Sequence, residues 1–155
     1  MPMEDAPAGW RLGGFGTPSR PWLALAASRR FLRPRSVRIL IGDLMWECDP
    51  SPAVAALSAG AAALHVVQLL ASGERAAEPG RYSLEDAESG ETVEMVLDDA
   101  AAARYATAFA AHQQGWSEAC AAAGAVFVSM DDADVLSPDG RMAPLEESGL
   151  IEPGR

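Results

Sequence analysis

The sequence predicts an α/β protein in which parallel strands are joined by a helix. The first observation is a pair of short, continuous apolar stretches, SVRILIG at residues 36–42 and LHVVQLL at 64–70, which are typical of buried strands. The second is a helix pattern between them. The third is the chain length of 155 residues, about half of them apolar, which suffices for one globular domain with one core.

Residues 49–60, DPSPAVAALSAG, predict the helix of this unit. Asp49 or Ser51 would cap it, Pro52 suits its first turn, and Gly60 would end it. A strand, a helix and a strand with short links imply a right-handed parallel crossover. The longest uncharged stretch, residues 51–73, is therefore interpreted as helix, turn and strand, and no direct membrane insertion is expected.

Residues 81–97 predict a β-hairpin. RYSLED and ETVEMVL flank AESG, a short loop with a glycine at its end, and the alternation in TVEMV indicates one packed face and one wet face. The acidic side chains of this segment form either a solvated face or a surface for a basic partner. They are Glu85, Asp86, Glu88, Glu91 and Glu94.

The longest helix is predicted to begin at Asp98 or Asp99 and to end at Gly124. One stripe along it carries residues spaced by three or four positions, which predicts a face turned toward the core. A third buried strand, AVFVSM at residues 125–130, follows and ends at DDAD. The stripe consists of Tyr105, Phe109, His112, Trp116 and Cys120.

The predicted organisation has three parts. Residues 1–20 are rich in glycine and proline and are interpreted as a flexible lead-in. Residues 21–134 form a single α/β domain that opens with a short helix over 21–32, PWLALAASRRFL. Residues 135–155 are rich in proline, glycine and glutamate, and we expect a loose tail with one short element near PLEESGLI.

The net charge of the chain argues against two classes of binding partner. The formal net charge of -10 argues against unaided binding to nucleic acid or to an anionic membrane. Seven of the twelve basic residues lie between Arg11 and Arg38, so the rest of the chain is strongly acidic.

Cys48 and Cys120 lack metal-site spacing and predict two buried free thiols. Because the first ten residues also lack the pattern of a signal peptide, a reducing, cytoplasmic location is expected.

The order of these segments resembles the C-terminal half of the bacterial "domain of unknown function fifty-eight" proteins, which are similar to von Willebrand factor A domains. The resemblance covers residues 36–134, from VRILIGDLMWECDP through LHVVQLLASGER to the segment between RYSLED and DDAD. It implies a three-layer α/β fold with a mostly parallel, von Willebrand A or Rossmann-like sheet, here truncated and with an added hairpin. Because some 35 residues replace the three strands that come first in such a domain, the strand at 36–41 is expected to keep an unpaired edge that favours self-association.

The resemblance also implies a function and a site. It implies a non-enzymatic protein-interaction module whose protein partner is a MoxR-type AAA+ ATPase. The metal sites of von Willebrand A domains use an Asp-x-Ser-x-Ser loop, a threonine, and an aspartate after the fourth strand. Asp43 stands at the position of that aspartate, and Gly42 where the family usually has serine or threonine. No Asp-x-Ser-x-Ser loop occurs in the chain, so we expect a degenerate metal site and no resident cofactor.

Two alternatives stay open. The first is a metal-dependent phosphoryl-transfer or hydrolytic enzyme that uses Asp43 with Asp131 or Asp132, since ligands bind at the carboxyl ends of parallel strands and Mg²⁺ prefers oxygen ligands. Asp43 on this view ligates a cation; otherwise it is a turn residue at the end of a strand. The second alternative is a fragment of a split gene whose missing half supplies the other strands.

Overall fold

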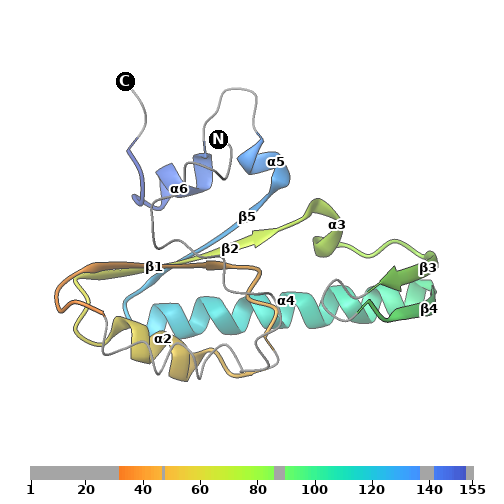
Figure 1. Ribbon diagram of the computed structural model, residues 1–155, viewed down its shortest axis with the longest axis horizontal. Coiled ribbons are helices and arrows are strands. Elements are labelled where there is room, and N and C mark those ends of the chain that lie inside the picture. Colours follow the sequence, from red (N-terminus) through yellow and green to blue (C-terminus); the bar gives the residue numbers. More distant parts are fainter. Residues whose placement is uncertain (1–31, 47, 86–89, 137–141, 153–155) are drawn as a thin grey trace.

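The computed structural model describes residues 32–46, 48–85, 90–136 and 142–152. The predicted lead-in at 1–20 lies outside these residues, as does the predicted helix at 21–32 except for Leu32. Figure 1 shows the elements in chain order: β1 Val37–Gly42, α2 Ser51–Ser58, β2 Ala63–Leu70, α3 Ser72–Arg75, β3 Gly80–Glu85, β4 Thr92–Leu97, α4 Asp99–Ala122, β5 Val126–Asp131, α5 Asp132–Val135 and α6 Ala143–Glu147.

Two sheets organise the described residues. The larger has the strand order β1-β2-β5, and all of its pairings are parallel. The smaller is the antiparallel hairpin β3–β4, in which Tyr82 is opposite Met95 and Leu84 is opposite Val93. The predicted α/β fold with parallel strands and a hairpin is confirmed. Three parallel strands are too few to establish a von Willebrand A fold.

The main core lies between one face of the sheet and the helices α2 and α4, which run below the sheet in Figure 1. The strand register places Arg38 beside Leu64 and Leu40 beside Val66, so these side chains share the helix-covered face. Fully burying one large apolar side chain stabilises a fold by about 1.5–3 kcal/mol. The buried members are Leu44, Val54, Leu57, Leu64, Val66, Trp116, Ala119 and Cys120.

The opposite face of the sheet is covered only in part. Val67, Val128 and Met130 are buried there against Leu145 and Leu150. The α6 helix is therefore the short element expected near PLEESGLI, and it brings the C-terminal segment onto β2 and β5. On the same face the side chains of β1 stay exposed, which leaves an apolar strip at the edge of the sheet.

Helix ends follow the expected chemistry with one shift in position. In α4 the Asp98 carboxylate accepts a hydrogen bond of 2.7 Å from the backbone N–H of Ala101, as predicted. In α2 the N-cap position is taken by Pro50, one residue from either predicted cap. The reason is that Asp49 accepts the N–H of Ser51 at 2.9 Å instead of capping the helix directly. Gly60 follows α2 at φ +73°, a conformation that costs glycine little.

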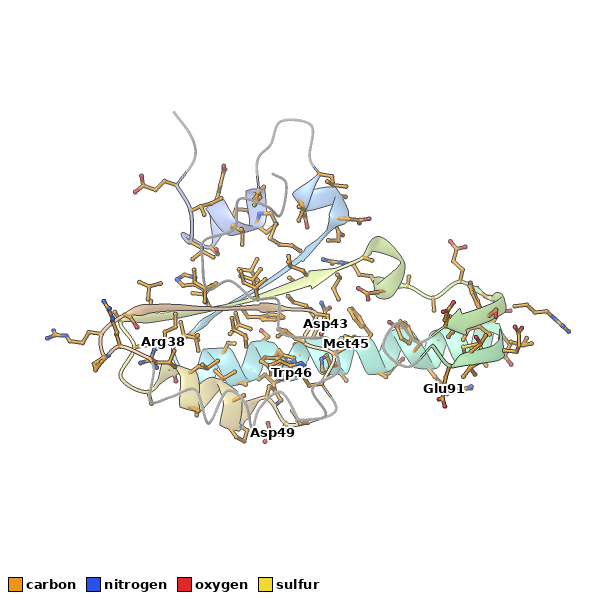
Figure 2. All side chains as sticks on the ribbon, in the orientation of Figure 1. Arg38, Asp43, Met45, Trp46, Asp49 and Glu91 are labelled. Atoms are coloured by element: carbon orange, nitrogen blue, oxygen red, sulfur yellow. The ribbon has the colours of Figure 1, made fainter. Side chains whose placement is uncertain are left out.

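Arg38 gives α2 a C-terminal partner that the sequence did not reveal. Its side chain is buried, and its guanidinium donates hydrogen bonds to the carbonyl oxygens of Leu57 and Ala59. Carbonyl groups at the end of a helix have no partner within the helix, and a cation there is favoured by the helix dipole. Figure 2 shows Arg38 on β1 above the end of this helix.

The predicted core stripe of α4 is largely correct. Phe109, Trp116 and Cys120 are buried, and the ring of Trp46 meets Trp116 edge-on with centroids 5.4 Å apart. Tyr105 and His112 are only half-buried, because each turns its polar atom to a backbone carbonyl outside α4.

The hairpin prediction was wrong in one respect. One face of β4 was expected to be packed, yet Val93 and Met95 are 58% and 37% exposed. The reason is that β3 and β4 form a two-stranded sheet of their own, and among the described residues a cleft, not a packed layer, separates this face from α4. Of the acidic residues named above, Asp86 and Glu88 lie outside the described residues, while Glu85, Glu91 and Glu94 are exposed.

Candidate functional site

The carboxyl ends of the parallel strands carry the aspartates that the sequence singled out. Asp43 follows β1, Asp131 ends β5 and Asp132 begins α5. Because β2 lies between β1 and β5, Asp43 and Asp131 are two strand spacings apart, roughly 10 Å. The fold therefore brings them to one edge of the sheet without placing them in contact.

Asp43 lies at the turn that leaves β1. Its side chain is exposed, and its Oδ1 accepts a hydrogen bond of 3.1 Å from the backbone N–H of Met45. Figure 2 labels both residues at the end of β1. An aspartate that accepts the N–H two residues further on is a common turn device. The geometry is thus that of a turn residue, and a metal-binding role for Asp43 stays a prediction.

Asp131 is engaged by its own chain. Its Oδ1 accepts hydrogen bonds from the N–H groups of Ala133 and Asp134 at 3.0 and 3.2 Å. In turn, the Oδ2 of Asp134 accepts a hydrogen bond of 3.0 Å from the N–H of Asp131. The Oδ2 of Asp131 lies 3.3 Å from the Nε of Arg75, an ion pair that links the end of β5 to α3. These contacts identify Asp131 as the cap of α5 and a link between β5 and α3.

Other groups capable of chemistry are dispersed. Among the described ranges, no three histidine, cysteine, aspartate or glutamate side chains lie close enough together to hold a metal ion. The two thiols are free, but Cys48 is only half-buried, so the prediction of two buried thiols is correct for Cys120 alone. His65 is half-buried in β2, and within the described part of the chain its Nδ1 has no hydrogen-bond partner.

Thiol and phenol acidities follow from burial. Burial raises the pKa of the Cys120 thiol to about 11. The pKa of Cys48 is also raised, first by burial and then by the charge of Asp49. Burial and the charge of Glu74 raise the pKa of Tyr105. All three groups are therefore neutral at pH 7, and neither thiol is activated as a nucleophile.

The turn after β1 contains an unusual backbone conformation. Leu44 has φ +57°, which is rare for a bulky residue, and its side chain is completely buried. The His112 Nε2 lies 2.8 Å from the carbonyl oxygen of Leu44, and a carbonyl can only accept, so Nε2 carries the hydrogen. The amide of Gln68 donates to the carbonyl oxygen of Asp43 at 2.9 Å. Core burial and two hydrogen bonds thus hold the turn.

A buried polar network lies beneath this turn. The Gln68 Oε1 accepts from the Gln113 amide at 2.9 Å and from the Ser129 hydroxyl at 3.2 Å, which joins β2 to α4 and β5. Gln113 also donates to the Ser129 hydroxyl at 3.0 Å. Sequence reasoning missed these residues. The available signal was Gln68 itself, a polar residue within the apolar strand LHVVQLL, on the face shared with Leu64 and Val66.

A cleft lies between the hairpin, α3 with the segment that follows it, and α4. Its volume is about 830 Å³. It is lined by one face of the hairpin together with Tyr105, and both charged residues that line it are glutamates. The lining residues of this hairpin cleft are Gly73, Glu74, Ala76, Ala77, Glu78, Tyr82, Leu84, Met95, Leu97 and Tyr105.

Two tyrosines fix the wall of the hairpin cleft. The Tyr105 hydroxyl donates to the carbonyl oxygen of Glu74 and the Tyr82 hydroxyl to that of Glu78, each at 2.6 Å. These bonds attach α3 to α4, and the segment after α3 to β3. The cleft therefore has walls that are held in place, although its hairpin side is a two-stranded sheet.

A second apolar surface follows the edge of β1. Val37, Ile39 and Ile41 are 60%, 51% and 60% exposed, and among the described residues β1 pairs with β2 alone. A groove of about 500 Å³ runs beside the strand and is lined in part by Leu32, Leu40, Leu57 and Leu64. The unpaired edge expected from the sequence is thus present in the described part of the chain.

Comparisons with known proteins do not narrow the function. No model of a known protein family, no curated protein and no solved structure matches this chain.

The described helices were also compared with the requirements of a membrane span. None of them is long and apolar enough to cross a bilayer.

Proposed function

We propose that this protein is a non-enzymatic protein-interaction module of the von Willebrand A-like class and that the hairpin cleft is its docking site. The observation that carries the proposal is the apolar face of the hairpin. Leu84 and Met95 line the cleft and yet are 49% and 37% exposed. A two-stranded hairpin is marginally stable alone, so an apolar face of this kind gains stability when a partner covers it.

The cleft defines the chemistry of the partner. Its lining offers apolar and aromatic side chains, and its charged members are Glu74 and Glu78. Buried aromatic and aliphatic anchors supply most of the binding energy at interfaces, while charges at the rim set specificity and association rate. We therefore assign as partner a protein segment with apolar anchors flanked by lysine or arginine. The net charge of -10 supports the same sign.

The first candidate partner is a MoxR-type AAA+ ATPase, the class implied by the resemblance of residues 36–134. The local roles of Asp43 and Asp131 support a degenerate metal site, because the main-chain and side-chain contacts of these carboxylates are explained by turns, caps and an ion pair. The enzyme alternative would need several carboxylates that converge on one point.

The proposal is tested by measuring the affinity of the full chain for a purified MoxR-type ATPase by biolayer interferometry. Leu84→Asp places a charge in the cleft, and we expect it to raise Kd by about tenfold or more. Val96→Asp is the matched control, since Val96 is 66% exposed on the opposite hairpin face. It should leave Kd within about twofold, and circular dichroism should confirm that both variants fold.

The experiment tests the ATPase as partner and the hairpin cleft as docking site separately. No binding by the wild-type chain would contradict the ATPase as partner. Binding that Leu84→Asp leaves unchanged, or that Val96→Asp weakens equally, would contradict the hairpin cleft as the docking site.

A further inference from the structure

The outer edge of β1 has the features of a strand that pairs with another strand. Ser36 accepts the N–H of Ala62 through its carbonyl oxygen, which points this group toward β2. Since backbone groups alternate along a strand, the N–H and C=O groups of Val37, Ile39 and Ile41 point to the open side. Edge strands are usually protected by charged side chains, proline or bulges. The charged residue within β1 is Arg38, and its guanidinium is turned into the helix layer.

We infer that two copies of this chain pair antiparallel through β1, so that their three-stranded sheets join into one continuous sheet. This interface is separate from the hairpin cleft and does not rest on the function proposed for it. A second copy is the favoured occupant because the edge is self-complementary in both its apolar side chains and its charges.

The first observation is the match of apolar side chains. Residues opposite each other in an antiparallel pair lie on the same face of the sheet, and a slip by one residue reverses the faces. A two-fold axis at Ile39 places Ile39 opposite its own copy and Val37 opposite Ile41. The three exposed side chains of each copy then form one apolar cluster, and the α2 and α4 helices of both copies stay on the same face.

The second observation is charge. Carried past the two ends of β1, the same register brings Arg35, in the turn just before the strand, near Asp43 of the second copy, just after it. Both side chains are exposed, and symmetry produces the pair twice. Moving the two-fold axis by one residue, to Leu40 or to Arg38, also keeps the faces aligned. The axis at Leu40 places Val37 opposite Asp43, and the axis at Arg38 places Ile41 opposite Arg35. The centred register is therefore the one that pairs opposite charges, and it gives Asp43 a role outside metal binding.

The experiment is sedimentation equilibrium of the full chain together with charge-reversal variants. Wild-type protein should sediment at twice the chain mass of 16.3 kDa. Arg35→Asp alone, or Asp43→Arg alone, places like charges opposite each other at both ends and should raise the dimer Kd by about tenfold or more. The double variant Arg35→Asp/Asp43→Arg restores opposite charges and should return Kd to within about threefold of wild type. Aspartate is suited to position 35, where φ is +57°.

A further variant keeps the test independent of the turn after β1. Ile39→Lys places a charge at the two-fold axis and should give a folded monomer, because the side chain is exposed. Asp43→Asn keeps an oxygen acceptor for the N–H of Met45 but removes the charge, and it should weaken the dimer less than Asp43→Arg. A monomeric wild-type protein, a dimer unaffected by Ile39→Lys, or a double variant no tighter than the single ones would each overturn the inference.

Discussion

The Nε2 of His112, in the middle of α4, donates a hydrogen bond of 2.8 Å to the carbonyl oxygen of Leu44, in the turn after β1. This contact joins residues 68 positions apart in the chain. It holds a bulky residue in a left-handed conformation whose cost is offset by the complete burial of its side chain. The turn after β1 is therefore tied directly to the helix layer of the fold.

Removing the His112 donor should weaken this attachment of the turn. His112→Leu leaves the Leu44 carbonyl without its partner, and we expect the free energy of unfolding to fall by about 1–3 kcal/mol. His112→Gln keeps a donor and should lose less. Urea denaturation measures both, with Gln114→Ala as control, because Gln114 on the same helix is exposed and donates a hydrogen bond to Glu118 at the helix surface. Equal stability of His112→Leu and wild type would show that the contact is dispensable.

Disrupting the buried Gln68 network should lower the free energy of unfolding more than truncating an exposed side chain of the same strand. Gln68→Leu removes the donor to the Asp43 carbonyl and the acceptor for Gln113 and Ser129. Each buried polar group left unsatisfied costs about 1–3 kcal/mol, so a fall in that range or above is expected. Leu69→Ala, at an exposed position of the same strand, should cost less. The reverse order of these two losses would contradict the structural role of the network.

Strands and helices could be read from the sequence because their signals are local. SVRILIG, LHVVQLL and AVFVSM are continuous apolar stretches, and each became a parallel strand. Gly60 and Gly124, at φ +73° and +64°, mark helix ends where the glycines predicted them. In β2 local pattern and tertiary structure agree, because burial on both faces requires apolar residues along most of a parallel strand. In β1 the prediction of a buried strand holds for one face only, since Val37, Ile39 and Ile41 are exposed.

The details of the candidate site could not be predicted, because they depend on contacts between distant residues. In the sequence Arg38 is one more basic residue, and its role is visible only in the fold, where the end of α2 places two carbonyl oxygens beside its guanidinium. His112 reads as part of a core stripe until Leu44 adopts its left-handed conformation. The exposed hairpin face was mispredicted for a related reason, since alternation indicates which side chains share a face but not whether a layer covers them.

Cys120 should make stability depend on pH in the alkaline range. Its folded-state pKa of about 11 lies above the value of an unfolded thiol, so the folded state holds this proton more tightly. The contribution is complete below pH of about 8.5 and is lost as pH rises toward 11. The free energy of unfolding should therefore decrease over this window, and less so in Cys120→Ala. An identical slope in the variant would show that another group is responsible.

The thiols of Cys48 and Cys120 should differ in their rates of reaction. With a colorimetric disulfide reagent at pH 8, Cys48 should react in a fast phase because it is partly exposed, while Cys120 should react only as the protein unfolds. Addition of urea should convert the slow phase to a fast one, and Cys48→Ser should remove the fast phase. A fast reaction of both thiols in the native protein would contradict the burial of Cys120.

Magnesium should not stabilise the protein. Asp43 supplies one exposed carboxylate, whereas Mg²⁺ needs near-octahedral oxygen coordination. A ligand that binds only the folded state adds about 2.7 kcal/mol at one hundred times its Kd, so a working site would raise Tm in millimolar Mg²⁺. We expect no change in Tm. A rise that disappears in Asp43→Ala would instead support the metal-dependent enzyme.

The most direct test of the interaction-module account is hydrogen exchange of the full chain with and without the purified ATPase partner. Binding in the hairpin cleft should slow exchange of the amides in β3, β4 and residues 73–78. The carboxyl ends of β1 and β5 should be unaffected. Protection confined to the turn at residues 43–45 and to residues 131–134, with the hairpin unchanged, would contradict the account and place the functional site at the edge of the sheet.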